Sequence, residues 1–223
     1  LENPGASADQ GVYSERVELQ NVDAKFPLPD LTAQYRSGHD WGYIQLGGIV
    51  RRIEWEDNNP DAFDFSGDAT GWGLSLSSNI KIQKDVIRLQ GVYGEGIQNY
   101  MNDAPVDIGI QNNFSDPVSP IIGVALPMWS MVAFWDHTWS DKWTSSIGGS
   151  YLEIDNSDGQ SADAFHSGTY IAGNLIYYPV PNVLAGIEYT YGQRKNFADD
   201  WSYNDNRVAV SFKYSFKQTF GGN

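Results

Sequence analysis

The chain has 223 residues, no cysteine, a formal charge of −14 at pH 7 and a mean hydropathy of −0.42. The absence of cysteine excludes disulfides and thiolate metal sites, and the negative charge argues against nucleic acid as a partner, because nucleic-acid binding needs a basic surface. No apolar run approaches the ~20 residues of a transmembrane helix, but a membrane barrel needs apolar side chains only at every second position of its strands.

Residues 1–30 mix glycine, asparagine, aspartate and proline with a short apolar patch around Val17 and Leu19. This composition predicts a long loop preceded by the stub of a strand. Residues 31–36 then alternate apolar and polar side chains and predict a short strand, and after a turn residues 41–56 predict a long one.

The middle of the chain predicts further strands by the same alternation. The clearest spans residues 71–82, where Trp72 and Leu74 face one way and Ser75 and Ser77 the other. The remaining predicted strands of this part are 85–99, 122–139, 143–155 and 168–178.

The last hairpin, residues 183–216, has the most regular pattern. In its second arm Val210 and Phe212 alternate with Ser211 and Lys213, and successive side chains of a strand point to opposite faces. The hairpin therefore has one apolar, aromatic face and one small, polar, basic face. It fits a soluble sandwich, whose apolar face packs in a protein core, and also a transmembrane barrel, whose apolar face meets lipid.

The connections between the predicted strands favour the barrel. Short turns are predicted at 37–41, 83–84, 141–142 and 179–182. They alternate with long, Asp-rich loops at 56–70, 101–120, 155–167 and 197–206. Short connections on one rim and long ones on the other are typical of outer-membrane barrels, whereas a Greek-key sandwich has no reason to keep this alternation.

Aromatic residues near the predicted strand ends agree with the same interpretation. They are Trp41, Trp72, Trp143, Tyr177 and Tyr178. In membrane barrels such residues form belts at the two interfaces. Each one alone is better explained as an ordinary core or surface aromatic, but their agreement with the pattern of connections favours a belt.

We thus predict an all-β fold, an antiparallel transmembrane β-barrel with nine strands and a leading stub. The chain is expected to be a single barrel unit over 1–223, with the long loop at 1–30, strands over 31–216 and a C-terminal tail at 217–223. Bacterial single-chain barrels have even strand numbers, and the chain begins at Leu1 without a signal peptide. We therefore expect it to be the C-terminal part of a larger barrel.

Several segments resemble the DcaP-type porins. These segments are 17–22, 29–33, 42–48, 182–189 and 212–216. The resemblance extends over nearly all of the chain after residue 16 and matches the C-terminal portion of the family. It implies a homotrimeric diffusion channel of the bacterial outer membrane for small anions, dicarboxylates especially, with sixteen strands of which these are the eighth to sixteenth. The loop that narrows such a channel is expected outside this chain.

Basic residues of the predicted strands occupy the alternate positions that point to the face opposite the apolar one. They are Arg36, Arg51, Lys81, Arg88, Arg194, Arg207 and Lys213. Few acidic residues share it, namely Glu188 and Asp136, and most carboxylates lie in the long loops. A low-dielectric wall focuses the field of such charges, so we expect these residues to line the pore and favour small anionic solutes. In the alternative interpretation they cap strand ends or form local pairs, as Glu188 would with Arg207 or Lys213.

Catalysis has little support in the sequence. It has no Gly-x-Ser-x-Gly elbow, no phosphate-binding glycine loop and no cysteine nucleophile. His39, His137 and His166 are too scattered to suggest a metal cluster, and Asp136 beside His137 faces the other way on a strand. We expect no enzyme and no cofactor. The acidic loop 56–68 could hold Ca²⁺, but its spacing matches no EF-hand, and a solvated loop is the better interpretation.

Two alternative interpretations of the sequence remain. A soluble, secreted β-sandwich that binds carbohydrate would also suit the glycines, aromatics and acidic loops, and extraction with or without detergent would distinguish it. A barrel plugged against flow has the same sequence features as a channel. On the barrel interpretation the partners are small anionic solutes, membrane lipid and further copies of the chain, without nucleic acid.

Overall fold

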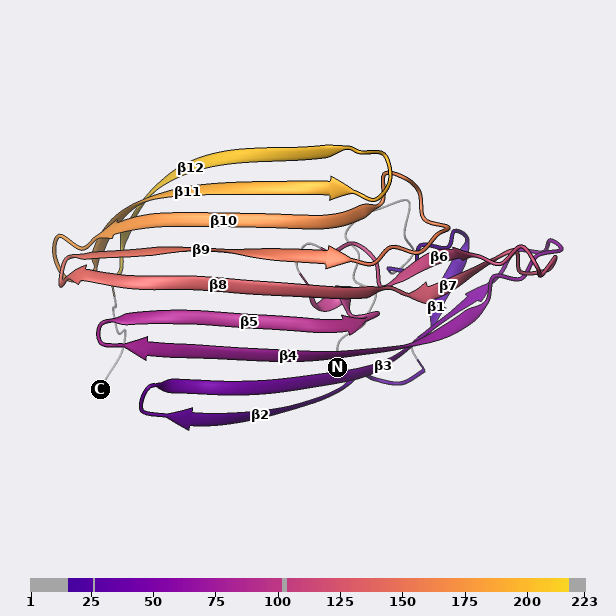
Figure 1. The fold of residues 1–223 in the computed structure, drawn as a ribbon, viewed down its shortest axis with the longest axis horizontal. Coiled ribbons are helices and arrows are strands. Elements are labelled where there is room, and N and C mark those ends of the chain that lie inside the picture. Colours follow the sequence, from indigo (N-terminus) through magenta and orange to yellow (C-terminus); the bar gives the residue numbers. More distant parts are fainter. Residues whose placement is uncertain (1–15, 26, 102–103, 217–223) are drawn as a thin grey trace, which may run out of the picture.

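The computed structural model describes residues 16–25, 27–101 and 104–216, and nearly all regular structure in it is β (Figure 1). The strands are β1 (Val22–Lys25), β2 (Leu31–His39), β3 (Gly42–Asp57), β4 (Gly67–Ile82), β5 (Asp85–Glu95), β6 (Ile108–Asn112), β7 (Ile121–Ala125), β8 (Pro127–Ser140), β9 (Trp143–Ile154), β10 (Phe165–Tyr177), β11 (Val183–Asn196) and β12 (Ser202–Tyr214). One 3₁₀ turn, η1 (Gln98–Tyr100), follows β5. Among the described residues no helix is long and apolar enough to cross a membrane.

Nine of these strands form one antiparallel meander, in the order β2-β3-β4-β5-β8-β9-β10-β11-β12. The short strand β1 extends the β2 edge by pairing with residues 54–57 of β3. In the part of the chain that the structure describes, β2 and β12 do not pair, so the sheet is a curved, open wall (Figure 1). The predicted nine strands and leading stub are confirmed.

The connections alternate as predicted. Turns of a few residues join β2 to β3, β4 to β5, β8 to β9 and β10 to β11, and the other connections gather at the opposite rim (Figure 1). The loop predicted at 197–206 is only five residues long, 197–201, because β12 begins at Ser202. Residues 202–206 place polar side chains on both faces, so this part of the strand shows no apolar alternation and was not predicted. The structure pairs it with β11 along its whole length.

The prediction of a plain loop over 101–120 was also too simple. The β5–β8 connection (residues 96–126) contains η1 and a separate hairpin, in which β6 pairs with β7. β6 was missed because it has only five residues. The strand predicted at 122–139 is divided in two, since residues 121–125 form β7 and β8 begins at Pro127.

The two faces of the sheet differ as the alternation predicts. We call them the outer face, with Leu46, Leu74 and Val210, and the inner face, with Gln34, Gln45 and Ser75. The outer face keeps large apolar side chains exposed. They include Leu31, Tyr35, Leu46, Leu74, Leu76, Leu89, Met131, Ile147, Ile171, Ile187, Val208 and Val210. A soluble protein rarely exposes so large and continuous an apolar surface.

Aromatic pairs occur at both ends of the outer face. Trp143 and Tyr177 stack with ring centroids 4.5 Å apart beside the short turns, and Trp72 meets Tyr93 edge-on at 5.7 Å near the long connections. Trp129 and Tyr151 also pair at the long-connection end. These rings are where aromatic belts of a membrane barrel belong.

Candidate functional site

The β5–β8 connection packs on the inner face of the sheet. Glycines at the inner positions of β4 and β5 make room for it: a Cβ on Gly73 would lie 2.5 Å from Ile97 Cδ1, and one on Gly71 would lie 2.7 Å from the carbonyl oxygen of Gly96. Such a close approach is possible only without a side chain. The connection therefore covers part of the surface that would line a channel.

Two buried apolar clusters hold this cover in place. In the first, Ile97 and Leu126 of the connection pack with inner-face residues such as Val92 and Met128. In the second, Ile108 packs with residues of the inner face of β3 and of the segment 17–22, which ends in β1. The members of this second cluster are Val17, Leu19, Val22, Ile53, Trp55 and Ile108. The buried core of this protein thus lies against the inner face of the sheet, at its long-connection end.

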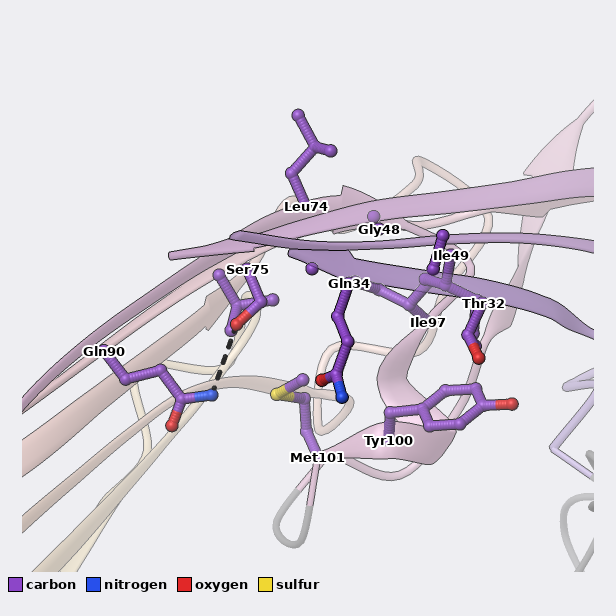
Figure 2. A pocket seen from close by; sticks show the side chains of 14 residues that line it. Thr32, Gln34, Gly48, Ile49, Leu74, Ser75, Gln90, Ile97, Tyr100 and Met101 are labelled. Atoms are coloured by element: carbon purple, nitrogen blue, oxygen red, sulfur yellow. Dashed lines mark hydrogen bonds between the residues drawn. The ribbon is translucent and has the colours of Figure 1, made fainter. Parts of the chain in front are cut away.

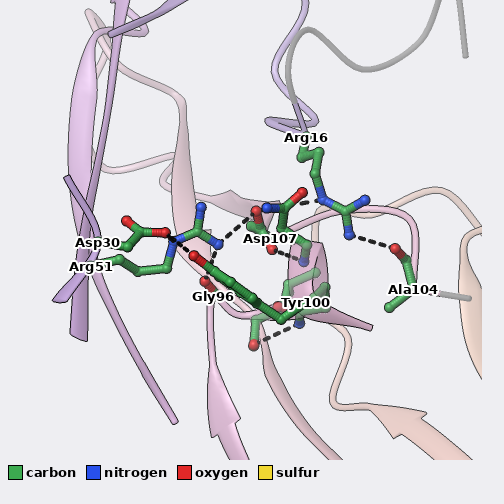
Figure 3. A network of polar contacts seen from close by, with 10 residues as sticks. Arg16, Asp30, Arg51, Gly96, Tyr100, Ala104 and Asp107 are labelled. Carbon is green, nitrogen blue, oxygen red and sulfur yellow. Dashed lines mark hydrogen bonds and ion pairs between the residues drawn. The ribbon is translucent and has the colours of Figure 1, made fainter. Parts of the chain in front are cut away.

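A buried network of charges joins the same parts (Figure 3). Arg51 of β3 donates from Nη1 to Asp107 Oδ2 at 3.1 Å and to the Gly96 carbonyl oxygen at 3.0 Å. Its Nε lies 3.2 Å from Asp30 Oδ2, which also accepts from the Tyr100 hydroxyl. The Arg51 side chain is completely buried.

Arg16 completes the network from the other side. Its Nε lies 3.5 Å from Asp107 Oδ2, and its Nη2 donates to the carbonyl oxygen of Ala104. Asp107 Oδ1 accepts from the backbone N–H of Asn99 at 2.7 Å. Burial raises the pKa of Asp107, and the neighbouring guanidinium groups of Arg51 and Arg16 limit the rise. The two arginines and two aspartates balance in charge, so the network ties the connection to the wall without adding net charge.

The strand register places all seven predicted basic residues on the inner face. Arg51 is the only one of them that is buried; the others are exposed. The exposed residues are Arg36, Lys81, Arg88, Arg194, Arg207 and Lys213. We call these six the exposed basic residues.

Three of the exposed basic residues have contacts. Arg36 lies over the Tyr43 ring, 3.6 Å from its centroid. Arg88 Nε pairs with Asp136 Oδ2 at 2.6 Å. Arg194 lies near the Phe165 ring and donates to a backbone carbonyl. Arg88 therefore forms a local pair of the kind that the alternative interpretation describes.

The side chains of Lys81, Arg207 and Lys213 make no hydrogen bond or ion pair within residues 16–25, 27–101 and 104–216. The pairing of Glu188 with Arg207 or Lys213, considered in the alternative interpretation, is absent from the same residues, where Glu188 stands opposite Ala209.

Some of these residues lie in one row across the sheet, in which each residue stands directly opposite its neighbour on the next strand. Arg88 of β5 and Arg207 of β12 belong to one row, which runs through Phe134, Gly148, Ala172 and Thr190. Acidic side chains on the same face include Asp136, Glu188 and Asp205. Asp205 was not predicted on this face, because its position was assigned to a loop; it lies in β12, opposite Gly192.

The described residues contain no group of three or more His, Asp or Glu side chains that could hold a metal ion. The acidic residues of the β3–β4 connection instead bond to backbone and side-chain groups nearby, as Asp57 does with Asn59 and Phe65.

Comparison with known proteins identifies the fold. The family model described as a porin subfamily, Porin_2, matches residues 5–222. Among solved structures the chain is similar to the outer-membrane channel DcaP of Acinetobacter baumannii, with a TM-score of 0.76 and 23% sequence identity over 90% of this chain and 55% of that one. It thus spans about half the length of that channel. The porin NanC is more distant, with a TM-score of 0.39 and 14% identity over 82% of this chain and 92% of that one.

No curated protein matches the chain. The expected resemblance to DcaP-type channels is confirmed in family and fold, and the soluble sandwich is not supported. The family match, together with the apolar outer face and the polar inner face, places the protein in the bacterial outer membrane. The chain belongs to the Porin_2 family, a subfamily of porins.

Proposed function

We propose that the chain forms part of the wall of an outer-membrane channel through which small hydrophilic solutes diffuse, with a preference for small anions such as dicarboxylates. The observation that carries the proposal is the group of exposed basic residues on the inner face, of which only Arg88 forms an ion pair among the described residues. Charges of one sign along a low-dielectric wall concentrate ions of the other sign in the pore.

A closed barrel is part of this proposal. The edge strands β2 and β12 do not pair with each other in the described residues, and open sheet edges are not tolerated in the hydrocarbon of a membrane. We propose that further strands close the wall into a barrel, sixteen strands in all, and that three barrels associate. Under this proposal Arg51 anchors the β5–β8 connection, and the exposed basic residues act on the solute.

A dicarboxylate suits this surface for a chemical reason. An arginine can hold a carboxylate through two parallel hydrogen bonds, and a solute with two carboxylates can contact two such groups. Arg88 and Arg207 stand in one row but on distant strands. Arg207 is free of local pairs among the described residues, whereas Arg88 already pairs with Asp136, so Arg207 is the stronger candidate.

The test is ion selectivity in planar bilayers, with succinate as the dicarboxylate. We expect the unchanged protein to prefer chloride over potassium and its current to be blocked by succinate. Replacing both Arg88 and Arg207 by serine should weaken the anion preference and the block. A matched control is Arg52→Ser, which removes an arginine from the outer face and should leave selectivity unchanged. Equal selectivity of the double variant and the unchanged protein would contradict the proposal.

A further inference from the structure

A cavity of about 600 Å³ lies between the inner face of β2–β5 and the start of the β5–β8 connection (Figure 2). Its volume is within the range of pockets that hold small organic ligands. Figure 2 shows Gln34, Ser75 and Gln90 on the sheet side of this cavity and Tyr100 and Met101 on the side of the connection, while Leu74 points away from it to the outer face.

The lining of the cavity contains no charged side chain, unlike the rest of the inner face. The basic residues next along the strands each have a contact already: Arg36 lies on the Tyr43 ring, Arg51 is buried with Asp30 and Asp107, and Arg88 pairs with Asp136. An anion in this cavity would find no free cation, and a cation would find no free carboxylate. The cavity therefore differs from the exposed basic residues in the solute that it suits.

The polar groups of the cavity come mainly from amides and hydroxyls. Gln34 Oε1 accepts from Gln45 Nε2 at 3.0 Å, and Gln90 Nε2 contacts Ser75 Oγ at 3.4 Å. This leaves the Gln34 amide N–H groups and the Gln90 carbonyl oxygen without a hydrogen-bond partner among the described residues. A donor and an acceptor of this kind match the hydroxyl and amide groups of an uncharged solute.

The remaining lining is apolar. Ile49 and Val92 come from the sheet, and Ile97 and Met101 from the connection. Gly47 adds open space at the centre of the wall, because a Cβ there would meet nothing nearer than the Ser75 Cβ at 3.9 Å. A pyranose ring presents hydroxyl groups at its edge and C–H groups on its faces, so it can use both kinds of surface.

We propose that this cavity is a binding site for an uncharged solute that carries hydroxyl or amide groups, of the kind exemplified by an N-acetylated monosaccharide. None of the exposed basic residues lines this site. It gives the channel a second class of solute, held by Gln34 and Gln90 and by the apolar side chains of η1 and its flanks.

The test is calorimetric titration of the detergent-solubilised protein with N-acetylglucosamine, a measurement that does not depend on ion conduction. We expect saturable binding. Gly47→Phe, which fills the cavity, should abolish it. The matched control is Gly192→Phe, which adds the same ring to the inner face of β11, where a Cβ would meet nothing within 4 Å; this variant should bind as the unchanged protein does.

A second variant tests the same site in case Gly47→Phe fails to fold. Replacing Gln34 and Gln90 together by leucine keeps the volume of the side chains but removes their hydrogen-bonding groups, and binding should weaken at least about tenfold. Titration with succinate should be the same in both cavity variants and in the unchanged protein. Absence of saturable binding, or binding that neither cavity variant weakens, would overturn the proposal, whatever the ion selectivity of the channel.

Discussion

Arg51 and Arg207 stand on the same face of one sheet and have opposite surroundings. Arg51 lies under the β5–β8 connection, completely buried and bonded to Asp30, Asp107 and Gly96. Arg207 lies on β12, beyond the reach of the connection, and is exposed without an ion pair among the described residues. The alternation along the strands alone predicts that both arginines line the pore. The segment folded over the sheet decides which arginine is structural and which is available to a solute.

The largest expected effect comes from removing Arg51. Arg51→Ser leaves Asp30 buried without its cation and Asp107 with Arg16 alone, and losing one partner of a buried ion pair costs about 3–5 kcal/mol. Arg207→Ser is the matched control and should change stability by no more than about 0.5 kcal/mol, because it removes an exposed side chain. Urea unfolding in detergent measures both. Equal losses in the two variants would contradict the contrast between these residues.

The next effect tests the assignment of the faces. Val210 is 80% exposed on the outer face, and its neighbour Ala209 is on the inner face. Val210→Arg should destabilise the folded protein by about 2–4 kcal/mol if this position lies in the hydrocarbon, whereas Ala209→Arg should cost clearly less. The measurement is unfolding in lipid vesicles. A larger cost for Ala209→Arg would mean that the inner face, and not the outer one, meets the hydrocarbon.

A smaller effect is expected where the connection approaches the wall. A methyl group on Gly73 would lie 2.5 Å from Ile97 Cδ1, whereas one on Gly47 would meet nothing nearer than 3.9 Å. Gly73→Ala should therefore overpack this contact and cost about 1–3 kcal/mol, and Gly47→Ala should be nearly neutral. Limited proteolysis of residues 96–126 would report whether the connection has loosened, and equal protection of both variants would show that the contact is not tight.

The smallest effect concerns pH. Burial raises the pKa of Glu18 above its ordinary value of 4.5, so the folded protein binds this proton more tightly than the unfolded chain. Protonated Glu18 therefore contributes to the free energy of unfolding. This contribution is complete at pH values below the ordinary pKa of Glu18 and is lost as pH rises through its raised pKa. Glu18→Gln should be more stable than the unchanged protein at pH 7, and the difference should shrink toward pH 4. A difference in unfolding free energy that is independent of pH would contradict the raised pKa.

The regular parts of the fold could be predicted from the sequence because period-two alternation determines the face of every side chain. Val210 and Arg207 were assigned to the correct faces for this reason. The start of β12 was missed, together with Asp205, because polar residues on both sides of a strand leave no alternation to read. Local propensity could not show that the β5–β8 connection folds back over the inner face.

That arrangement depends on contacts between residues far apart in the sequence. Arg51 and Asp107 are 56 residues apart, and nothing in the pattern around either one indicates the other. The glycines of β4 and β5 were a usable signal, since glycine inside a strand often marks a close approach of another segment. The cavity beside η1 arises from the same fold-back and could not have been inferred from the strands alone.

The most direct test of the proposed anion preference is the reversal potential of the unchanged protein in a planar bilayer under a potassium chloride gradient. If the exposed basic residues face the pore as proposed, the potential should have the sign that chloride permeation gives, and the current should fall when succinate is added. A potential of the opposite sign would mean that acidic groups control permeation, and would contradict the role assigned to Arg207 and its neighbours.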